Sequence, residues 1–509
     1  MKKLIHIKTI LGALVCLLVV LLFSFRKFQE SKFISLGKDR SLIYHPDENG
    51  NIIPDFSRVG YHQGDLDIPS VSVVKSISPA TSGSSQELIQ AAIDEVSNLN
   101  PDKNGFRGAI LLKKGTYIIP GTIKINKGGI VLRGEGDGAK GTKLLASGKG
   151  KRSLIIVSGS GAVKEIKGTR TLLTQDDVPV GQVFVPVENP EYFKVGDEII
   201  VYRPGTDLWI KDLQMDQIIP REGTKQWHAK EYNLSFERVI TKIVGKQLFI
   251  DQPIMMPLEK KYGGAEVFKY SFNGRIAEVG VENILFESEY ATETDEDHAW
   301  DALEWNKIAH GWVSNVTAQF FGNSCVNIKS DAKYITVRNS KCLDAKSIIT
   351  GGRRYSFNVD GQFNLVRDCE TTEGRHDYVT GSRTLGPNVF YNCKAKNTHA
   401  DIGPHHRWSV GTLYDNITTD GEINIQDRGN WGTGHGWVGT TQVVWNAKVK
   451  RASVQSPWIS GKNYAIGIQG EKYNGRLEGK PDGEWESRSQ FVTPQSLYIA
   501  QLADRKNKQ

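Results

Sequence analysis

Histidine, arginine and tyrosine side chains are concentrated between residues 353 and 437 of this chain. Five of the eleven histidines lie there, in short phrases rich in arginine, glycine and aromatic residues. Histidine and tyrosine can transfer protons when neighbouring groups tune their pKa values, and arginine can bind a carboxylate through two parallel hydrogen bonds. The candidate catalytic residues are His376, Tyr378, His405, His406, Arg407 and Arg354, and the candidate substrate-binding residues are Arg353, Arg375, Arg383, Trp408, Gln426, Arg428, His435 and Trp437.

These residue types suit elimination at a uronic acid. The reaction needs a base for the proton α to the carboxylate, a cation that neutralises the carboxylate, and an acid for the leaving oxygen. On an extended strand, His376 and Tyr378 would project to the same face, whereas His405 and His406 would alternate. The sequence leaves open which group is base and which is acid. The candidates for the cation are Arg354, Arg375, Arg383 and Arg407.

Two other functions remain open. A glycoside hydrolase needs two carboxyl groups that face one glycosidic bond, and Asp377, Asp401 and Asp427 are the acids available for it. A non-catalytic glycan-binding surface protein would need neither base nor acid. The sugar, the linkage and the choice between endo and exo action are not encoded in any recognisable motif.

The sequence contains no motif typical of zinc, nucleotide-binding or serine-hydrolase sites. The chain has no CxxC pair, no HExxH, no P-loop and no nucleophile elbow. The only cofactor candidate is calcium, because the acidic run Asp295-Glu296-Asp297, followed by His298 and Trp300, offers oxygen ligands. A solvated acidic loop is the alternative interpretation of the same run.

A repeated phrase shows how distant residues could come together. An apolar residue, any residue and then Asn or Asp recurs at Asn315, Asn339, Asp368, Asn392, Asn416 and Asn446, at separations of 24, 29, 24, 24 and 30 residues. Regular spacing of this length is typical of a solenoid, and the Val-, Ile-, Phe- and Tyr-rich runs between turns indicate strands. The pattern predicts an all-β chain wound as a parallel β-helix, in which the histidine phrases stack on one flank.

Other segments are expected to cap or interrupt this solenoid. Residues 81–161 should hold a capping helix, with a Ser84/Glu87 capping box and an apolar face that includes Leu88, Ala92, Val96 and Leu99, and then the first coils. Residues 162–265 resemble a small antiparallel β insertion, with Pro186 at a sheet edge and a hairpin turn at Gly245. The expected boundaries are 1–28 for a signal peptide or anchor, 29–80 for an irregular segment, 266–450 for the main β-helix and 451–509 for the C-terminal segment.

Charge and the N-terminus indicate an exported protein with an acidic partner. The net charge is +7, and the isoelectric point is about 8.9. No basic-aromatic pattern resembles a nucleic-acid module, so an acidic polysaccharide is the expected partner. The apolar run Ile10–Phe25 predicts export to the periplasm or beyond, with membrane contact only through an uncleaved anchor. A monomer is expected, and the cysteines Cys325, Cys342, Cys369 and Cys393 should be small buried residues of the coils.

The N-terminal half carries a family resemblance. The capped helix and the phrases GAILLKKGTYII, GGIVLRGEGDG and TKLLA are similar to the opening of pectate-lyase-like, right-handed parallel β-helix proteins, and the likeness extends more loosely through residues 276–450. The resemblance implies carbohydrate-active chemistry, either β-elimination on uronate polymers or hydrolysis. The signature catalytic strings of the family are absent here, so the resemblance assigns no catalytic residue. The first expectation is a polysaccharide lyase acting on an acidic, uronate-containing and sulfated or unsulfated glycan.

Overall fold

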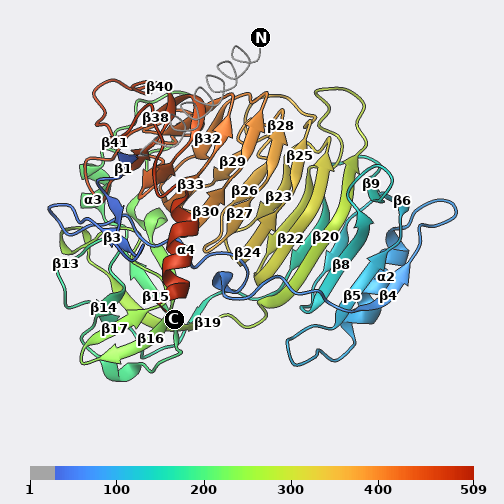
Figure 1. Ribbon diagram of the computed structural model, residues 1–509, viewed down its shortest axis with the longest axis horizontal. Helices are drawn as coiled ribbons and strands as arrows, with labels where there is room; N and C mark the ends of the chain where they lie inside the picture. Colours follow the sequence, from blue (N-terminus) through green and yellow to red (C-terminus); the bar gives the residue numbers. More distant parts are fainter. Residues whose placement is uncertain (1–28, 509) are drawn as a thin grey trace, which may run out of the picture.

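A computed structural model describes residues 29–508 as a long stack of parallel strands (Figure 1). Twenty-nine strands form one continuous parallel sheet that winds into a β-helix, which confirms the predicted all-β fold class. The predicted signal peptide or anchor, residues 1–28, lies outside the described residues. No helix within residues 29–508 has the length and apolar character needed to cross a membrane.

The coils form two runs separated by an insertion. The first run comprises β4 (Val73–Ile77), β5 (Gly108–Leu112), β6 (Gly115–Ile119), β7 (Ile123–Ile125), β8 (Ile130–Gly136), β9 (Thr142–Ala146) and β10 (Ser153–Ser158). The second run begins with β20 (Ile276–Ser288), β21 (Asp301–Asn306), β22 (Ile308–Gln319), β23 (Ser324–Ile328), β24 (Lys333–Arg338), β25 (Lys341–Leu343), β26 (Phe357–Val359), β27 (Leu365–Arg367), β28 (Glu370–Thr372) and β29 (Tyr378–Thr380). It continues with β30 (Leu385–Tyr391), β31 (Lys394–Lys396), β32 (Asp401–Pro404), β33 (Ser409–Asp415), β34 (Thr418–Thr419), β35 (Glu422–Ile425), β36 (Gly439–Thr440), β37 (Val443–Trp445), β38 (Lys448–Val454), β39 (Tyr464–Ile466), β40 (Gln469–Lys472) and β41 (Glu484–Glu486). The coils therefore run past residue 450.

The repeated phrase marks one corner of every coil. Its apolar residues pair in register from coil to coil, in the order Val313, Val337, Val366, Phe390, Tyr414 and Val444. All six of the Asn or Asp residues that end the phrase have φ between +49° and +56°. Asn and Asp tolerate this left-handed conformation better than other residues with a Cβ. The Asn and Asp residues of the repeated phrase therefore form a row of sharp turns, and the apolar residues of the phrase line the interior beside this row.

The interior of the coils is apolar, and it contains the four cysteines of the described chain. Cys325, Cys342, Cys369 and Cys393 are buried free thiols within the main core. Cys369 and Cys393 lie one coil apart. Each directly follows the turn residue of its coil, Asp368 or Asn392, so both have the same position relative to the repeated phrase. The prediction that they are small buried residues is confirmed.

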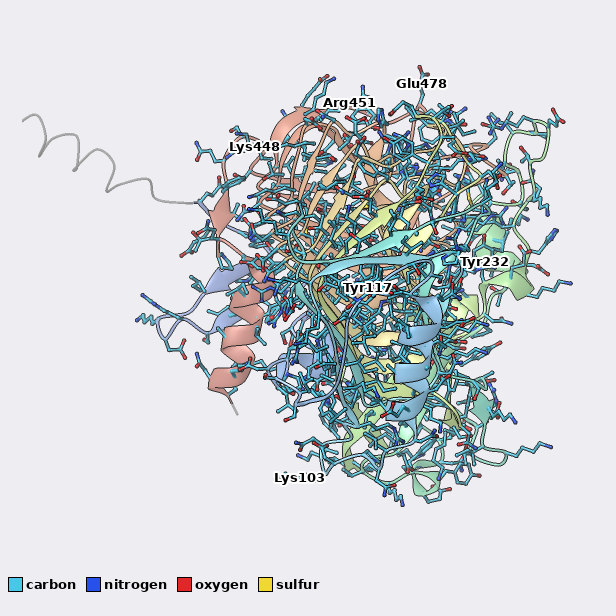
Figure 2. All side chains as sticks on the ribbon, turned by 90° about the vertical axis from the view of Figure 1, so that its right-hand side faces the viewer. Lys103, Tyr117, Tyr232, Lys448, Arg451 and Glu478 are labelled. Carbon is cyan, nitrogen blue, oxygen red and sulfur yellow. The ribbon has the colours of Figure 1, made fainter. Side chains whose placement is uncertain are left out.

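Helix α2 (Gln86–Ser97) covers the first coils, as Figure 2, which faces this end of the molecule, shows. Its buried residues are Ile89, Ala92, Ile93 and Val96. The predicted capping box is wrong, because the N-cap is Ser85 and its side chain makes no cap bond. Ala92 and Val96 of the predicted apolar face are buried, whereas Leu88 and Leu99 are exposed at 47% and 42%.

The insertion folds as a separate antiparallel sheet beside the coils. Its elements are β11 (Lys164–Glu165), β12 (Thr171–Leu172), β13 (Asp177–Val178), β14 (Phe184–Pro186), β15 (Glu198–Arg203), α3 (Asp207–Asp212), β16 (Leu234–Val244), β17 (Gln247–Ile250), β18 (Leu258–Glu259) and β19 (Glu266–Ser271). As predicted, Pro186 lies on the edge strand β14, and Gly245 lies in the β16–β17 hairpin turn. Trp209, Trp227 and Tyr232 are fully buried in its core and line no groove.

Short terminal elements pack beside this insertion. They are β1 (Gln29–Glu30), β2 (Ile34–Leu36), β3 (Leu42–Tyr44), β42 (Val492–Thr493) and α4 (Leu497–Asn507). Strand β1 pairs with β42, and Gln501 of α4 binds the backbone of Pro54 and Phe56. The two ends of the described chain are thereby joined along one side of the stack.

Candidate active site

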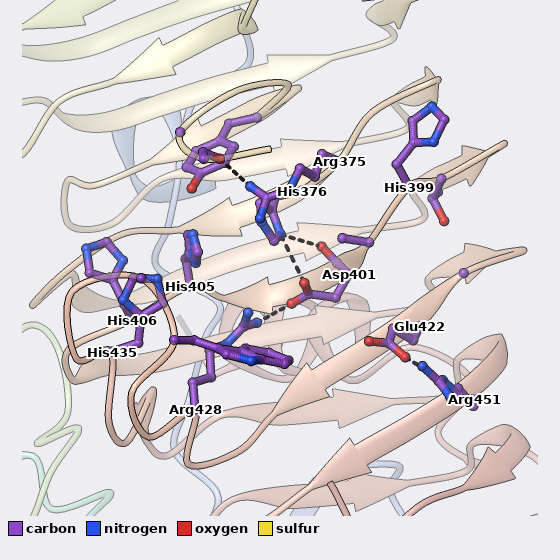
Figure 3. A pocket seen from close by; sticks show the side chains of 18 of the residues that line it. Arg375, His376, His399, Asp401, His405, His406, Glu422, Arg428, His435 and Arg451 are labelled. Atoms are coloured by element: carbon purple, nitrogen blue, oxygen red, sulfur yellow. Dashed lines mark hydrogen bonds and ion pairs between the residues drawn. The ribbon is translucent and has the colours of Figure 1, made fainter. Parts of the chain in front are cut away.

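A cavity of about 970 Å³ lies on the flank of the coils between β26 and β38 (Figure 3). Its walls come from the turns that precede β26, β29, β32 and β35, from the residues that follow β32 and β35, from β38 and from one loop of the insertion. The residues with side chains that can bind charge or transfer protons are Arg221, Tyr355, Arg375, His376, His399, Asp401, His405, His406, Asp420, Glu422, Arg428, Trp431, His435, Lys450 and Arg451. Winding therefore brings together residues that are far apart in the sequence.

The centre of the cavity is a chain of three buried side chains. His376 Nδ1 lies 3.1 Å from Asp401 Oδ1 and 3.2 Å from the Asp401 backbone oxygen, and Asp401 Oδ2 pairs with Arg428. Burial alone would raise the pKa of Asp401, but Arg428 and His376 outweigh it and hold this pKa well below its usual range. Since Nδ1 faces two oxygen acceptors, it carries the ring proton, and Nε2 of the neutral imidazole is a free acceptor.

Four imidazoles form a cluster around this chain. The His376 and His405 ring centroids are 4.4 Å apart, and His435 lies 4.8 Å from His405 and 4.9 Å from His406. Burial lowers the pKa of His376 and His405, and it lowers the pKa of His406 to about 4 and of His435 to about 3, with nearby arginines adding to the effect. All four rings are therefore neutral at neutral pH.

Each ring of this cluster also has a buried nitrogen without a hydrogen-bond partner among the described residues. These atoms are His376 Nε2 and the Nδ1 atoms of His405, His406 and His435. Buried polar atoms are paired in most folded proteins, so four unpaired nitrogens in one cavity require an explanation. Binding of a polar ligand, or transfer of a proton, is the explanation that the position in a cavity favours.

Tyr355 completes the cluster and was not among the predicted site residues. Its ring meets His376 edge-on at 4.9 Å and His405 at 5.2 Å. Burial raises the pKa of Tyr355 to about 12, so the phenol keeps its proton at neutral pH. The sequence predicts Arg353 and Arg354 as site residues, whereas the turn of residues 351–355 places Tyr355 at the cavity, against His376 and His405.

The cavity contains cations that differ in their partners. Arg428 is paired with Asp401 and Arg451 with Glu422. Within residues 29–508, Arg375, Arg221 and Lys450 have no carboxylate within 4.0 Å, and Arg375 donates only to the backbone oxygen of Gly351. These three cations are available to an anionic ligand, and Arg375 directly precedes His376 in the chain.

Six of the fourteen predicted site residues line the cavity, and eight do not. Those at the cavity are His376, His405, His406, Arg375, Arg428 and His435. Tyr378 lies in the coil interior, where its hydroxyl donates to the backbone oxygens of Cys369 and Lys394. The predicted shared face of His376 and Tyr378 is wrong, because β29 begins only at Tyr378 and His376 belongs to the turn before it.

The other seven residues that do not line the cavity have structural partners. Arg354 donates to the Ser347 and Glu373 backbone oxygens, Arg407 to that of Thr433, and Arg383 to that of Glu231. Arg353 is bound to Glu296. Trp408 and Trp437 are buried against the insertion, and Gln426 bonds Asn424 and the Arg476 backbone. Their predicted contact with substrate is corrected to a role in holding turns and packing the insertion.

Arg407, Arg221 and Trp227 fix the wall formed by the loop after β35. Arg407 Nη2 and Arg221 Nη2 donate to backbone oxygens of Thr433 and Gly432 at 2.9 and 3.0 Å, and Trp227 Nε1 donates to Gly434. No sequence pattern connects the insertion to this loop, which is about two hundred residues away. This is why Arg221 and Trp431 could not be identified as cavity residues.

None of the acids that a hydrolase would use is a free carboxylate at the cavity. Asp377 is fully buried, accepts a hydrogen bond from Ser356 on one oxygen only, and does not line the cavity. Asp401 holds His376 and Arg428, and Asp427 pairs with Lys480 at 2.7 Å. Of the remaining cavity acids, Asp420 accepts from the backbone N–H groups of Asn397 and Thr398. No two free carboxyl groups of the described chain face each other across the cavity.

The acidic run at 295–297 is also engaged in local bonds. Asp295 accepts from the backbone N–H groups of Ala291 and Asp297, and Glu296 pairs with Arg353 and Lys151. His298 is buried between Ser288 and the backbone oxygen of Lys346. In residues 29–508, no group of three or more His, Cys, Asp or Glu side chains has the geometry of a metal site.

Comparison with known proteins gives likeness in fold alone. No protein-family model matches the chain, and no curated protein sequence matches it. Among solved structures, the tailspike protein gp49 from Pseudomonas phage LKA1 aligns at 14% identity over 76% of this chain and 70% of its own, with a TM-score of 0.40. An alginate lyase from Paenibacillus sp. str. FPU-7 aligns at 10% identity over 82% and 100%, with a TM-score of 0.41, and pectate lyase Pel9A at 13% over 79% and 78%, with a TM-score of 0.32. The parallel β-helix architecture predicted from the sequence is shown by the winding of the strands themselves.

Proposed function

We propose that this protein is a polysaccharide lyase that cleaves a uronate-containing glycan by β-elimination in the cavity between β26 and β38. One observation carries the proposal. His376 is neutral, its Nδ1–H is directed at Asp401, and its unpaired Nε2 lies in the same cavity as Arg375, a cation without a carboxylate partner among the described residues. A base and a carboxylate-binding cation are the two groups that abstraction of a uronate α-proton requires.

His376 is the best candidate for the base. In the proposed step, Nε2 takes the proton α to the uronate carboxylate, and the ring becomes an imidazolium that Asp401 stabilises across 3.1 Å. The electron pair forms the carbon–carbon double bond as the glycosidic carbon–oxygen bond breaks. Because Nε2 is buried and the Tyr355 and His405 rings contact His376, a substrate reaches this atom only when one of those rings shifts.

Arg375 and Tyr355 supply the other two roles. The Arg375 guanidinium would pair the uronate carboxylate, which lowers the cost of the negative charge that develops during proton removal. Tyr355, which stays protonated because burial raises its pKa to about 12, would donate its proton to the leaving oxygen. The resulting tyrosinate regains a proton from solvent, and His376 releases its proton before the next turnover.

The structure favours elimination over hydrolysis on the same scaffold. Hydrolysis with two carboxyl groups needs one protonated acid and one free carboxylate at about 5–10 Å separation, and the cavity acids are committed to His376, Arg428, Arg451 or backbone N–H groups. The imidazoles, in contrast, are neutral and unpaired. The net charge of +7 and the N-terminal apolar run are in keeping with an exported protein that meets an acidic polymer outside the cytoplasm.

The test is a panel of acidic polysaccharides incubated with the full chain. Elimination leaves an unsaturated uronate at the new non-reducing end, which absorbs in the ultraviolet, together with one new reducing end per cleavage. The proposal expects both signals to rise together on at least one uronate polymer. Reducing ends without ultraviolet absorbance would establish hydrolysis, and binding without either signal would establish a glycan-binding protein.

A further inference from the structure

The cavity contains a row of stacked residues that leads away from His376. His376 contacts Asp401, the residue after Ala400, and the register of the paired strands places Gly421 beside Ala400 and Lys450 beside Gly421. The backbone bond from Lys450 N to Gly421 O, 2.9 Å, confirms the last step. His376, Ala400, Gly421 and Lys450 all line the cavity. The two middle positions bear a methyl group or no side chain, so the path from the imidazole to the lysine is open.

The length of this row can be estimated from the repeat of the coils. Adjacent parallel strands lie about 4.8 Å apart, so Lys450 is about 14 Å from His376 along the stack. Figure 3 shows the neighbouring row, in which Asp401, Glu422 and Arg451 lie on successive coils in the same direction. A ligand that contacts both His376 and Lys450 must therefore span three coil spacings.

Lys450 is the free cation at the far end of this row. Its side chain is exposed, and it forms no ion pair with the described residues. The acids near it are occupied, since Glu422 pairs with Arg451, and the Asp420 carboxylate accepts the backbone N–H groups of Asn397 and Thr398 at 2.6 and 3.3 Å. Thr398 Oγ1, a buried atom of the same wall, has no hydrogen-bond partner there. Lys450 thus ends the path as a free cation, and the unpaired Thr398 hydroxyl borders the path beside Gly421.

We propose that Lys450 forms a second anion subsite, which binds a carboxylate or sulfate on a sugar about three coils from the reacting uronate, with the Thr398 hydroxyl as a polar contact along the path between them. This inference rests on the proposed function and adds the substrate class. The preferred substrate is a glycan with anionic groups on recurring sugars, because Arg375 at one end and Lys450 at the other bind two charges on one chain. A glycan with a single isolated uronate would occupy the Arg375 end only.

The matched pair of variants is Lys450→Ala and Lys448→Ala. Both lysines are exposed residues of β38, two positions apart, but only Lys450 lines the cavity. On a long polyuronate, Lys450→Ala is expected to raise KM about fivefold to tenfold with kcat unchanged. This is the result expected when a contact that binds the substrate and the transition state equally well is lost. Added salt should shrink the difference. Lys448→Ala should match the wild type, and so should Lys450→Ala on an oligomer too short to reach the subsite.

Two substrates identify the anion. An effect of Lys450→Ala on an unsulfated polyuronate assigns a carboxylate, and an effect only on a sulfated uronate glycan assigns a sulfate ester. Equal KM values for the two lysine variants on both polymers would overturn the subsite while leaving elimination intact. If no polymer is cleaved, the proposed function fails, and the same variants are then compared by equilibrium binding of the intact polymers. Weaker binding by Lys450→Ala alone supports the subsite, and equal binding refutes it.

Discussion

His376 Nδ1 and Asp401 Oδ1 lie 3.1 Å apart although 25 residues separate them in the chain. The contact exists because β29 and β32 are neighbouring coils, and both side chains are almost completely buried. Arg428, from the coil after Asp401, binds the other carboxylate oxygen. Three successive turns of the β-helix thus build one hydrogen-bonded unit, which ends at the unpaired His376 Nε2.

Asp401→Asn tests whether the carboxylate orients the imidazole. An amide in place of the carboxylate can donate to Nδ1 and favour the wrong tautomer, so kcat should fall by about 10²–10⁴-fold. The change also leaves Arg428 buried without its partner, which should lower the free energy of unfolding by about 3–5 kcal/mol. Kinetics must therefore be measured well below the melting temperature.

Glu237→Gln is the matched control for this stability loss. Glu237 is a buried carboxylate that pairs with Arg275 at 2.8 Å between the insertion and the coils, away from the cavity. Glu237→Gln should lower the melting temperature about as much as Asp401→Asn does, and it should leave kcat close to the wild-type value. Equal kcat values for the two variants would mean that Asp401 acts on folding alone.

The pH profile follows from the direction of the pKa shifts. A histidine base works in its neutral form, and burial lowers the pKa of His376 from its usual 6.5. The value of kcat/KM should therefore stay constant from about pH 7 down to about pH 6.5 and fall only below it. Since the pKa of Tyr355 is about 12, no alkaline limb is expected below about pH 10. A loss of activity that begins above pH 7 on acidification would contradict this assignment.

The same buried imidazoles should affect stability at low pH. The unfolded chain binds protons near pH 6.5, whereas His406 and His435 in the folded chain bind them only near pH 4 and 3. The stabilising effect of these neutral rings is thus complete above pH 6.5 and is lost as the pH falls toward 3. Melting temperatures in the assay buffers separate this effect from the kinetic one.

Arg375→Ala and Arg353→Ala distinguish a free arginine from a paired one. Arg375 has no carboxylate partner among the described residues, whereas Arg353 binds Glu296 outside the cavity. Loss of the carboxylate-binding cation should reduce kcat/KM by about 10²–10³-fold, and loss of the partly exposed Arg353–Glu296 pair should change the free energy of unfolding by about 1 kcal/mol or less. The measurement is the steady-state rate of each variant on one uronate polymer. Equal rates for the two variants would rule out Arg375 as the cation that binds the uronate carboxylate.

The two tyrosines of neighbouring coils should respond in opposite ways. Tyr355→Phe removes the proposed acid and should lower kcat by about 10²-fold or more with little change in melting temperature. Tyr378→Phe removes two hydrogen bonds to backbone oxygens in the core, which should cost about 1 kcal/mol or more of stability and leave kcat unchanged. A catalytic defect in Tyr378→Phe in a fully folded protein would contradict the structure.

The sequence was sufficient to predict the coils because their repeat is local. The turn at each of Asn315, Asn339, Asp368, Asn392, Asn416 and Asn446 needs a positive φ, and this requirement leaves Asn or Asp at a regular spacing. The same repeat correctly predicted that His376, His405 and His435 would lie on one flank. Stacking alone determines that outcome, and stacking follows from the spacing.

The individual side-chain directions could not be predicted in this way. The spacing predicts that Tyr378 shares a face with His376, but side chains alternate only within the strand, and β29 starts at Tyr378. Trp408 and Trp437 are predicted as substrate-binding residues, but they are buried in the core shared with the insertion. Such errors arise at turns and at contacts between distant segments, where no periodic pattern constrains the chain.

Chemical rescue of His376→Ala tests the central claim most directly, because the cavity left by the ring can accept free imidazole. The account predicts that His376→Ala forms the ultraviolet-absorbing product at least about 10²-fold more slowly than the wild type and that added neutral imidazole restores part of the rate. The control is His399→Ala, because His399 lies at the cavity rim and pairs with Glu373. This variant should need no rescue. A wild-type rate of product formation by His376→Ala would contradict the account.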